Sequence, residues 1–268
     1  KLVAGLIDEV YDIYNVIRSV TLNPVMHYGL NAGLLRPGDP ADFIVVDDLR
    51  KMNILESWIN GEKIYDNGDI LFKYSPGNPV NNFNCSDITR QQISVRNNGE
   101  EIRVITAFDG ELFTKEIILE SGKNNIIEPD VVHDILKIIV KDRYQDSKPA
   151  VGFIKGFGLK DGAFASSVAH DSHNIISIGA NDNDIVNAVN EIVKMKGGLA
   201  VSSGGKVNSF PLNIAGIMST RTCTEVAQDY EKLSALVKNL GCTMTAPFMT
   251  LSFMALLVIP ELKLSARG

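Results

Sequence analysis

The sequence has little cysteine, and its cysteines form no recognisable pattern. Three of 268 residues are cysteines, and Cys85, Cys223 and Cys242 stand far apart without a Cys-x-x-Cys pair. An odd number of widely separated cysteines argues against a disulfide framework and against a cysteine zinc site. We therefore expect a reducing, cytoplasmic setting, with Cys223 and Cys242 as buried small apolar side chains flanking a helix.

An excess of basic charge and a long hydrophobic run are also missing. The 26 Lys and Arg are scattered among 32 Asp and Glu, for a net charge of −6. Without a basic stripe nothing attracts a phosphate backbone, so we expect no nucleic-acid partner. The longest apolar run, 248–260, contains Thr250 and Ser252 and is too short to cross a bilayer of about 30 Å. It predicts a core element rather than a membrane segment.

The beginning of the sequence lacks both a methionine and a signal peptide. Lys1 is the first residue, and residues 2–10 have the pattern of a helix already in progress. We expect a fragment or a processed product. Residues 1–30 are expected to be helical throughout, with an interruption at Asn23-Pro24 because a residue before proline is driven out of the helical region.

After the helical region the sequence changes to short strands and turns. Apolar runs at 42–47 and 58–65 predict strands, and Asn60-Gly61 predicts a two-residue hairpin because both positions of such a turn need positive φ. A loop at 74–84, rich in Pro, Gly and Asn, predicts a domain boundary. Further strands are expected in the second domain at 91–96, 101–107, 114–119, 135–140 and 151–154.

Two helices are predicted in the second domain, at 182–195 and 222–240. Apolar residues recur at helical spacing in the first, and Thr222-x-x-Glu225 forms a capping box at the start of the second. A Gly204-Gly205 turn between them predicts another hairpin. No strict βαβ alternation is present, so we expect an α/β protein of the α+β type, with a mixed, mainly antiparallel sheet and flanking helices.

Residues 21–47 carry a resemblance to a known superfamily. Thr21-Leu22-Asn23-Pro24, Tyr28-Gly29-Leu30 and the stretch 33–47 resemble the passage by which metal-dependent amidohydrolases leave their TIM barrel for a small β-sandwich. The resemblance implies terminal barrel helices at 1–30 and part of the β-sandwich at 31–75, with the rest of the barrel missing. It also implies that Asp42 is a structural aspartate.

A second, more specific resemblance covers nearly everything after residue 150. The stretches 152–159, 162–176, 212–218, 247–253 and 258–262 look like the C-terminal domain of bacterial and archaeal adenine deaminases. This implies a linker at 76–85 and the adenine deaminase C-terminal α/β domain at 86–268.

The resemblance implies hydrolytic deamination of adenine to hypoxanthine and ammonia, in purine metabolism. In this family a divalent metal, manganese or iron, activates the attacking water. Its ligands lie on barrel strands, and this sequence has no His-x-His pair, so we expect this chain to hold no metal and to be inactive alone. The expected partners are adenine, the upstream barrel domain and further copies in a homo-oligomer. The alternatives are another cyclic amidohydrolase and a non-catalytic binding or oligomerisation module.

One cluster of chemically capable side chains stands out. His170, Asp171 and His173 are candidate catalytic residues, because imidazole and carboxylate groups can titrate near neutral pH, and Ser167 and Asn174 are candidate substrate-binding residues. The alternative is a hydrogen-bonded turn between two strands. The His-x-x-His spacing has no third metal ligand in view.

Other candidates favour structural interpretations. The glycines of 152–158 are not followed by the helix and lysine of a phosphate loop, so tight strand packing is the preferred explanation over a ligand-lining role. His27 and His133 each stand alone and are expected to be surface or packing residues.

Overall fold

A computed structural model describes every residue except Lys1, Val10 and Pro76. The chain divides into two compact units, residues 1–75 and 76–268. The last residue of the helix expected at 2–10 and the first residue of the linker expected at 76–85 lie outside the described residues. The predicted domain bounds inside each unit stay predictions.

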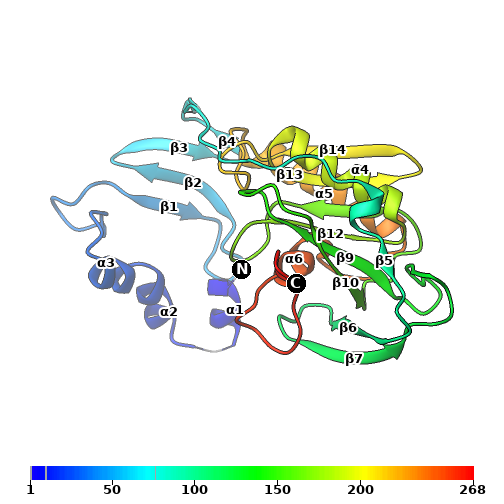
Figure 1. Cartoon of the computed structure of the whole chain (residues 1–268). Coiled ribbons are helices and arrows are strands. Elements are labelled where there is room, and N and C mark those ends of the chain that lie inside the picture. Colours follow the sequence, from blue (N-terminus) through cyan, green and yellow to red (C-terminus); the bar gives the residue numbers. More distant parts are fainter. Residues whose placement is uncertain (1, 10, 76) are drawn as a thin grey trace. The chain divides into compact units, whose positions relative to one another are not determined.

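The first unit contains three short helices followed by a four-stranded sheet (Figure 1). The strands pair antiparallel in the order β1-β2-β3-β4. The helices are α1 (Leu2–Asp8), α2 (Ile13–Val20) and α3 (Leu22–Tyr28), and the strands are β1 (Phe43–Val46), β2 (Ile54–Ile59), β3 (Glu62–Asp66) and β4 (Asp69–Ile70).

The predicted helix interruption at Asn23-Pro24 is wrong in position. Helix α2 ends before Thr21, and both Asn23 and Pro24 lie inside α3. Proline is tolerated there because the amides of a helix's first turn have no intrahelical acceptor, so its missing N–H removes no helical bond.

Two predictions for the first unit are confirmed. Asn60 and Gly61 both have positive φ, 50° and 78°, and join β2 to β3 as a hairpin. The Asp42 carboxylate accepts the backbone N–H groups of Gly33 and Asn60, each at 2.7 Å. The bond from Asn60, and then that from Gly33, lowers the pKa of Asp42. Asp42 therefore ties two loops to the start of β1, as expected of a structural aspartate.

The second unit is built on an eight-stranded sheet in the order β14-β13-β11-β12-β9-β10-β6-β7. Of its seven pairings only β6–β10 is parallel, which confirms a mixed, mainly antiparallel sheet. Among the described residues, neither the four-stranded nor the eight-stranded sheet closes into a barrel. The strands are β6 (Glu101–Ala107), β7 (Thr114–Glu120), β9 (Leu136–Lys141), β10 (Ala150–Lys155), β11 (Ala163–Ser166), β12 (Ile175–Gly179), β13 (Gly198–Ser203) and β14 (Lys206–Pro211).

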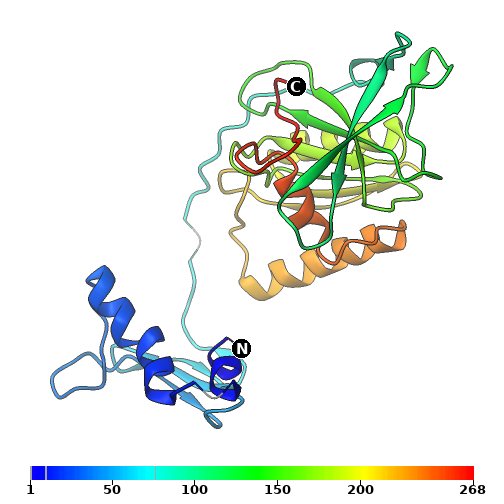
Figure 2. The same cartoon turned by 90° about the horizontal axis from the view of Figure 1, so that it is seen from below.

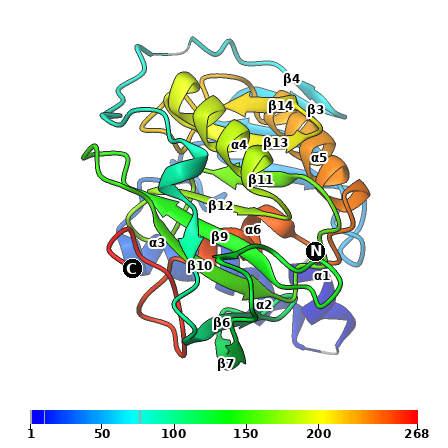
Figure 3. The ribbon, with the colours of Figure 1, turned by 45° about the vertical axis from the view of Figure 1, so that its right-hand side comes forward.

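Helices cover both faces of this sheet. Helix α4 (Asp182–Met195) packs on one face, and Figure 3 shows it lying along β13, β11 and β12. Helices α5 (Cys223–Asn239) and α6 (Pro247–Phe253) pack on the other face, next to each other in orange and red in Figure 2. Side chains of β9 alternate between these faces, so every residue of this central strand is buried.

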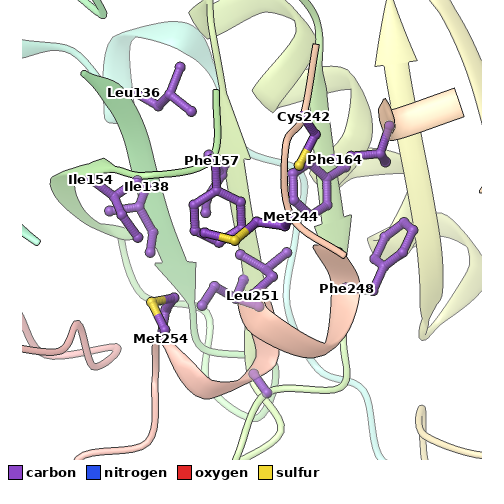
Figure 4. Close-up of a cluster of buried hydrophobic side chains, with 14 of the residues drawn as sticks. Leu136, Ile138, Ile154, Phe157, Phe164, Cys242, Met244, Phe248, Leu251 and Met254 are labelled. Atoms are coloured by element: carbon purple, nitrogen blue, oxygen red, sulfur yellow. The ribbon is translucent and has the colours of Figure 1, made fainter. Parts of the chain in front are cut away.

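The larger core lies between the sheet and helices α5 and α6. Aromatic and aliphatic side chains from strands, loops and α6 meet there, including the edge-to-face pair Phe164–Phe248 at 5.3 Å (Figure 4). Each such side chain contributes roughly 1.5–3 kcal/mol when buried. The predicted core role of 248–260 holds for α6, whereas Leu257 and Val258 are exposed.

The local predictions for the second unit are mostly confirmed. Helix α4 has the predicted bounds, although its left-handed C-cap is Lys196 rather than a glycine. The capping box of Thr222 and Glu225 opens α5 as expected. Gly204 and Gly205, with φ of 57° and 80°, join β13 to β14.

Two predictions for the second unit are wrong. Residues 91–96 do not form one strand, because Arg90–Gln92 is a 3-10 turn (η1) and only β5 (Val95–Arg96) is extended, paired with β8 (Ile126–Ile127). Cys223 is exposed at the first position of α5, while Cys242 is buried and burial raises its pKa to about 11. The first turn of a helix on the surface has one side open to solvent, which explains the difference.

None of the described helices is both long and apolar enough to span a bilayer.

Candidate functional site

The five predicted site residues all lie on one connection of the large sheet. Residues 167–174 join β11 to β12, which pair antiparallel with Ser166 opposite Ile176. Ser167 directly follows β11 and Asn174 directly precedes β12, so both are held at the ends of hydrogen-bonded strands. The structure therefore places these residues on a single short loop, anchored at both ends.

Helix α6 holds His170. The His170 N–H donates to the Ser252 carbonyl at 2.9 Å. Its ring stacks on Phe253, with centroids 5.1 Å apart and planes inclined by 22°. One face of the imidazole is therefore fixed against α6 while the side chain stays partly exposed.

His173 is packed against His170 in an environment that disfavours its charge. The two ring centroids are 5.6 Å apart in an edge-to-face arrangement. Burial, then the nearby His170 and Arg143, lower the pKa of His173, and the opposing effect of Asp171 is smaller. At neutral pH His173 is therefore a neutral imidazole.

The two ring nitrogens of His173 differ in environment. Nδ1 is buried without a hydrogen-bond partner among the described residues. A buried N–H without an acceptor is rarer and more costly than an unpaired acceptor, which favours the tautomer with hydrogen on Nε2. That tautomer gives His173 a donor on the open side of its ring.

Ser167 is fully buried and its hydroxyl is bonded within the scaffold. Its Oγ–H donates to the Gly216 carbonyl at 2.5 Å and Oγ accepts the Gly198 N–H at 2.8 Å. These bonds connect the loop to β13 and to the segment before α5. The predicted contact of Ser167 with substrate stays a prediction, and its observed contacts are structural.

Asn174 and Asp171 lie at opposite extremes of exposure. Asn174 is buried, and its Oδ1 accepts the Arg143 N–H at 3.2 Å. Asp171 is exposed at the outer part of the loop. The loop is thus both a hydrogen-bonded turn and a surface that presents two imidazoles and a carboxylate.

The sequence interpretation missed three residues that form the base of this loop. Arg143 and Tyr144 follow β9, and Phe253 ends α6. Arg143 is only 4% exposed, and its guanidinium lies over the Tyr144 ring at 4.8 Å. The signal available in the sequence was a charged and aromatic pair shortly after the buried strand β9, but nothing local connects that pair to the loop.

The described residues do not fit a metal ion. No group of three or more His, Cys, Asp and Glu side chains converges anywhere outside the three undescribed positions. The two imidazoles and Asp171 can act in proton transfer and hydrogen bonding.

A cavity in the second unit lies away from this loop. It has a volume of about 740 Å³ and is lined by β6, β7, β8 and the turn before β9. His133 is at its edge, exposed, with Nδ1 2.6 Å from Asp130 Oδ2. His27 is exposed on α3 beside Tyr28. Both histidines are surface residues, as predicted.

The glycines after β10 pack tightly against backbone. The Asp134 carboxylate accepts the N–H groups of Gly156 and Gly158 at 2.6 and 2.7 Å. A Cβ at Gly156 would lie 2.2 Å from the Ala107 carbonyl oxygen, and its φ is +107°. These contacts favour the packing interpretation over a ligand-lining role.

Comparison with known proteins gives two family matches. Residues 111–268 match the adenine deaminase C-terminal domain, and residues 5–64 match the amidohydrolase family. The first match contains the whole 167–174 loop.

Several curated relatives named adenine deaminase are similar over nearly the full chain. The protein of Methanosarcina barkeri is 50% identical over 96% of this chain and 48% of its own length. Those of Salinibacter ruber and Borreliella burgdorferi are 44% and 40% identical over all of this chain and 49% of their own lengths. The chain spans about half the length of the curated relatives it matches.

Proposed function

The chain belongs to the adenine deaminase family, and from that premise we propose that it is the C-terminal part of an enzyme that hydrolyses adenine to hypoxanthine and ammonia. The observation that carries this proposal is the match of residues 111–268 to the adenine deaminase C-terminal domain. The similarity to relatives named adenine deaminase supports it over nearly the whole chain.

In this proposal, the residues that bind the metal ion lie outside this chain. The divalent ion, manganese or iron, supplies activation of the attacking water, and it would be held by an upstream barrel domain. The complete protein would work in purine metabolism in the cytoplasm, as a homo-oligomer.

This chain's contribution is the 167–174 loop. His170, Asp171 and His173 are proposed to face the purine and to exchange protons with it, and Ser167 and Asn174 to contact it. His173 is suited to this role because it is neutral at physiological pH and its open ring edge can donate a hydrogen bond. Asp171 is suited because its carboxylate is exposed.

An assay with two proteins tests where the chemistry resides. We expect the protein with its upstream sequence to release ammonia from adenine in the presence of Mn²⁺ or Fe²⁺, and to lose that activity on chelation. Residues 1–268 alone should show none. Adenine deamination by residues 1–268 would contradict the proposal, and activity only on other cyclic amides or amines would identify a different amidohydrolase.

The four histidines of the chain provide a matched test of the loop. His170→Asn and His173→Asn in the complete protein should each lower kcat by about 10²-fold or more, the usual effect of losing a general acid or base. His27→Asn and His133→Asn, at exposed positions, should leave kcat unchanged. Equal kcat in all four variants would show that the loop is only a structural turn.

A further inference from the structure

Arg143 carries a buried positive charge that makes no salt bridge with a carboxylate in the described part of the chain. It is 4% exposed, and within the described part of the chain no ion pair joins it to Asp or Glu. Removing a cation from water costs several kcal/mol in a folded protein, and buried charges are normally paired. Its Nε is also buried and has no hydrogen-bond partner among the residues that the structure describes. Because burying this guanidinium is costly, we look for a role of Arg143 that a neutral side chain could not perform.

The contacts of Arg143 converge on the 167–174 loop by two routes. Through the main chain, its N–H donates to Asn174 Oδ1 at 3.2 Å. Through the side chain, Nη2 donates to the Tyr144 hydroxyl at 2.7 Å, and that hydroxyl donates to the Ser172 carbonyl at 3.2 Å. The two acceptors flank His173 in sequence, so Arg143 holds the loop on either side of this imidazole.

The guanidinium is itself fixed from the opposite side. Its Nη1 donates to the Ala215 carbonyl at 2.7 Å. A Cβ at Gly216 would lie 2.1 Å from Nη1, so glycine leaves the space that the guanidinium occupies. The Gly216 carbonyl in turn accepts the hydroxyl of Ser167. Both ends of the loop are therefore connected to one segment, 215–216, and Arg143 is the link on the His173 side.

We propose that Arg143 is the positioning residue of this site: with Tyr144 it holds the backbone on either side of His173 through hydrogen bonds, and it keeps a positive charge near the imidazole. The importance of Arg143 to catalysis rests on the proposed function. The hydrogen bonds on either side of His173, which we call the clamp, can be measured without any turnover. The charged groups that act on His173 are His170, Arg143 and Asp171. Arg143 thus acts through His173 and does not itself touch substrate.

Tyr144→Phe tests the mechanical part of the clamp. Tyr144 is 40% exposed, so removing its hydroxyl should leave the fold intact while freeing the Ser172 carbonyl. Loss of one such bond corresponds to about a five-fold change in a local opening equilibrium, so amide hydrogens of the loop should exchange about five-fold faster. Tyr65→Phe, in the other compact unit, is the control. Unchanged exchange in the loop would overturn the proposal.

Arg143→Lys and Arg143→Met separate charge from geometry. The chain has only four histidines, so NMR titration of their ring signals can follow His173 directly. Arg143→Met should raise the pH at which His173 titrates, because a nearby positive charge is lost. Arg143→Lys should leave that pH nearly unchanged but accelerate loop exchange, because an ammonium cannot reproduce the two-pronged guanidinium contacts. Arg103→Met, at an exposed arginine, is the charge control.

The outcomes distinguish this inference from the proposed function. Unchanged His173 titration in a folded Arg143→Met would overturn the role of the buried cation. If Arg143→Met does not fold, Tyr144→Phe and Arg143→Lys still test the clamp. A clamp confirmed in a protein that does not deaminate adenine would leave this inference standing and the proposed function wrong.

Discussion

Protonation of His173 is unfavourable in the folded protein, and this affects stability as well as chemistry. Burial is the largest cause, and the neighbouring His170 and Arg143 act in the same direction. The folded-state pKa therefore lies below the ordinary value of 6.5 that applies to the unfolded chain. Unfolding becomes more favourable as pH falls through that value, because the unfolded state binds the proton more readily.

We expect His173→Asn to reduce this sensitivity to acid. Asparagine tolerates the positive φ of 51° at this position and does not titrate. The difference in urea midpoint between pH 7.5 and pH 5.5 should be smaller in the variant than in the parent. His27→Asn, which removes an exposed histidine, is the control. If the difference in urea midpoint were the same in parent and variant, His173 would have the same pKa in the folded and the unfolded state.

Gly156 is a residue whose identity the backbone requires. Its φ of +107° and the 2.2 Å that would separate an added Cβ from the Ala107 carbonyl oxygen leave no room for a side chain. Gly156→Ala should lower the free energy of unfolding by about 3 kcal/mol, from strain and overpacking together. Gly77→Ala, where a Cβ meets nothing within 4 Å, should be nearly neutral. Chemical denaturation of both variants measures the difference.

At the scale of elements, strand β9 and helix α4 are joined by a buried ion pair. Lys137 Nζ donates to Asp182 Oδ1 at 2.5 Å, and neither side chain is more than 5% exposed. Lys137 lies on the α4 face of β9, and Asp182 is the first residue of the helix. The pair fixes where α4 begins over the sheet.

Breaking this pair from one side should be costly. Lys137→Met leaves a buried carboxylate without its partner and should lower the free energy of unfolding by about 3–5 kcal/mol. Lys137→Met combined with Asp182→Leu should cost much less than the sum of the single changes, because no charge remains buried. Urea denaturation of the parent, the two single variants and the double variant measures the interaction free energy between Lys137 and Asp182. Additive effects would show that the pair does not interact in solution.

Elements with local signals were predictable, and the central strands β9 and β10 were expected at 135–140 and 151–154, but not every buried strand was placed. The bounds of α4, the hairpins at Asn60-Gly61 and Gly204-Gly205, and the capping box of α5 follow from residues within four positions of one another. Strands β11 and β12 entered only as the two unplaced strands of the turn considered at the histidine cluster, and their bounds were not predicted because all their residues are buried and show no alternation of polar and apolar side chains.

At the scale of the whole molecule, the two compact units differ in how much core they contain. Of the buried hydrophobic residues, only Val16 belongs to the described part of residues 1–75. The second unit contains all three hydrophobic clusters. Burial of apolar surface is the main favourable term in folding, so the first unit is much less stable by itself.

We therefore expect the two units to unfold separately. In residues 1–268, amide hydrogens of α2 and β2 should exchange at least about ten-fold faster than those of β9 and β12, because the first unit opens without the second. Mild proteolysis should cut within 76–85 and leave a resistant fragment of the second unit. Equal protection in both units, or a single cooperative unfolding transition, would contradict this expectation.

The sequence alone determined the local structure, the family resemblance and the crowding of histidines at 170–173, because these depend on neighbours in the chain or on motifs as they stand. Only the tertiary structure decided which groups meet under that loop. Arg143 bonds to Ala215, 72 positions away, and Ser167 bonds to Gly216, 49 positions away. Such contacts depend on the order of strands in the sheet, where residues distant in sequence become adjacent only once the sheet has formed.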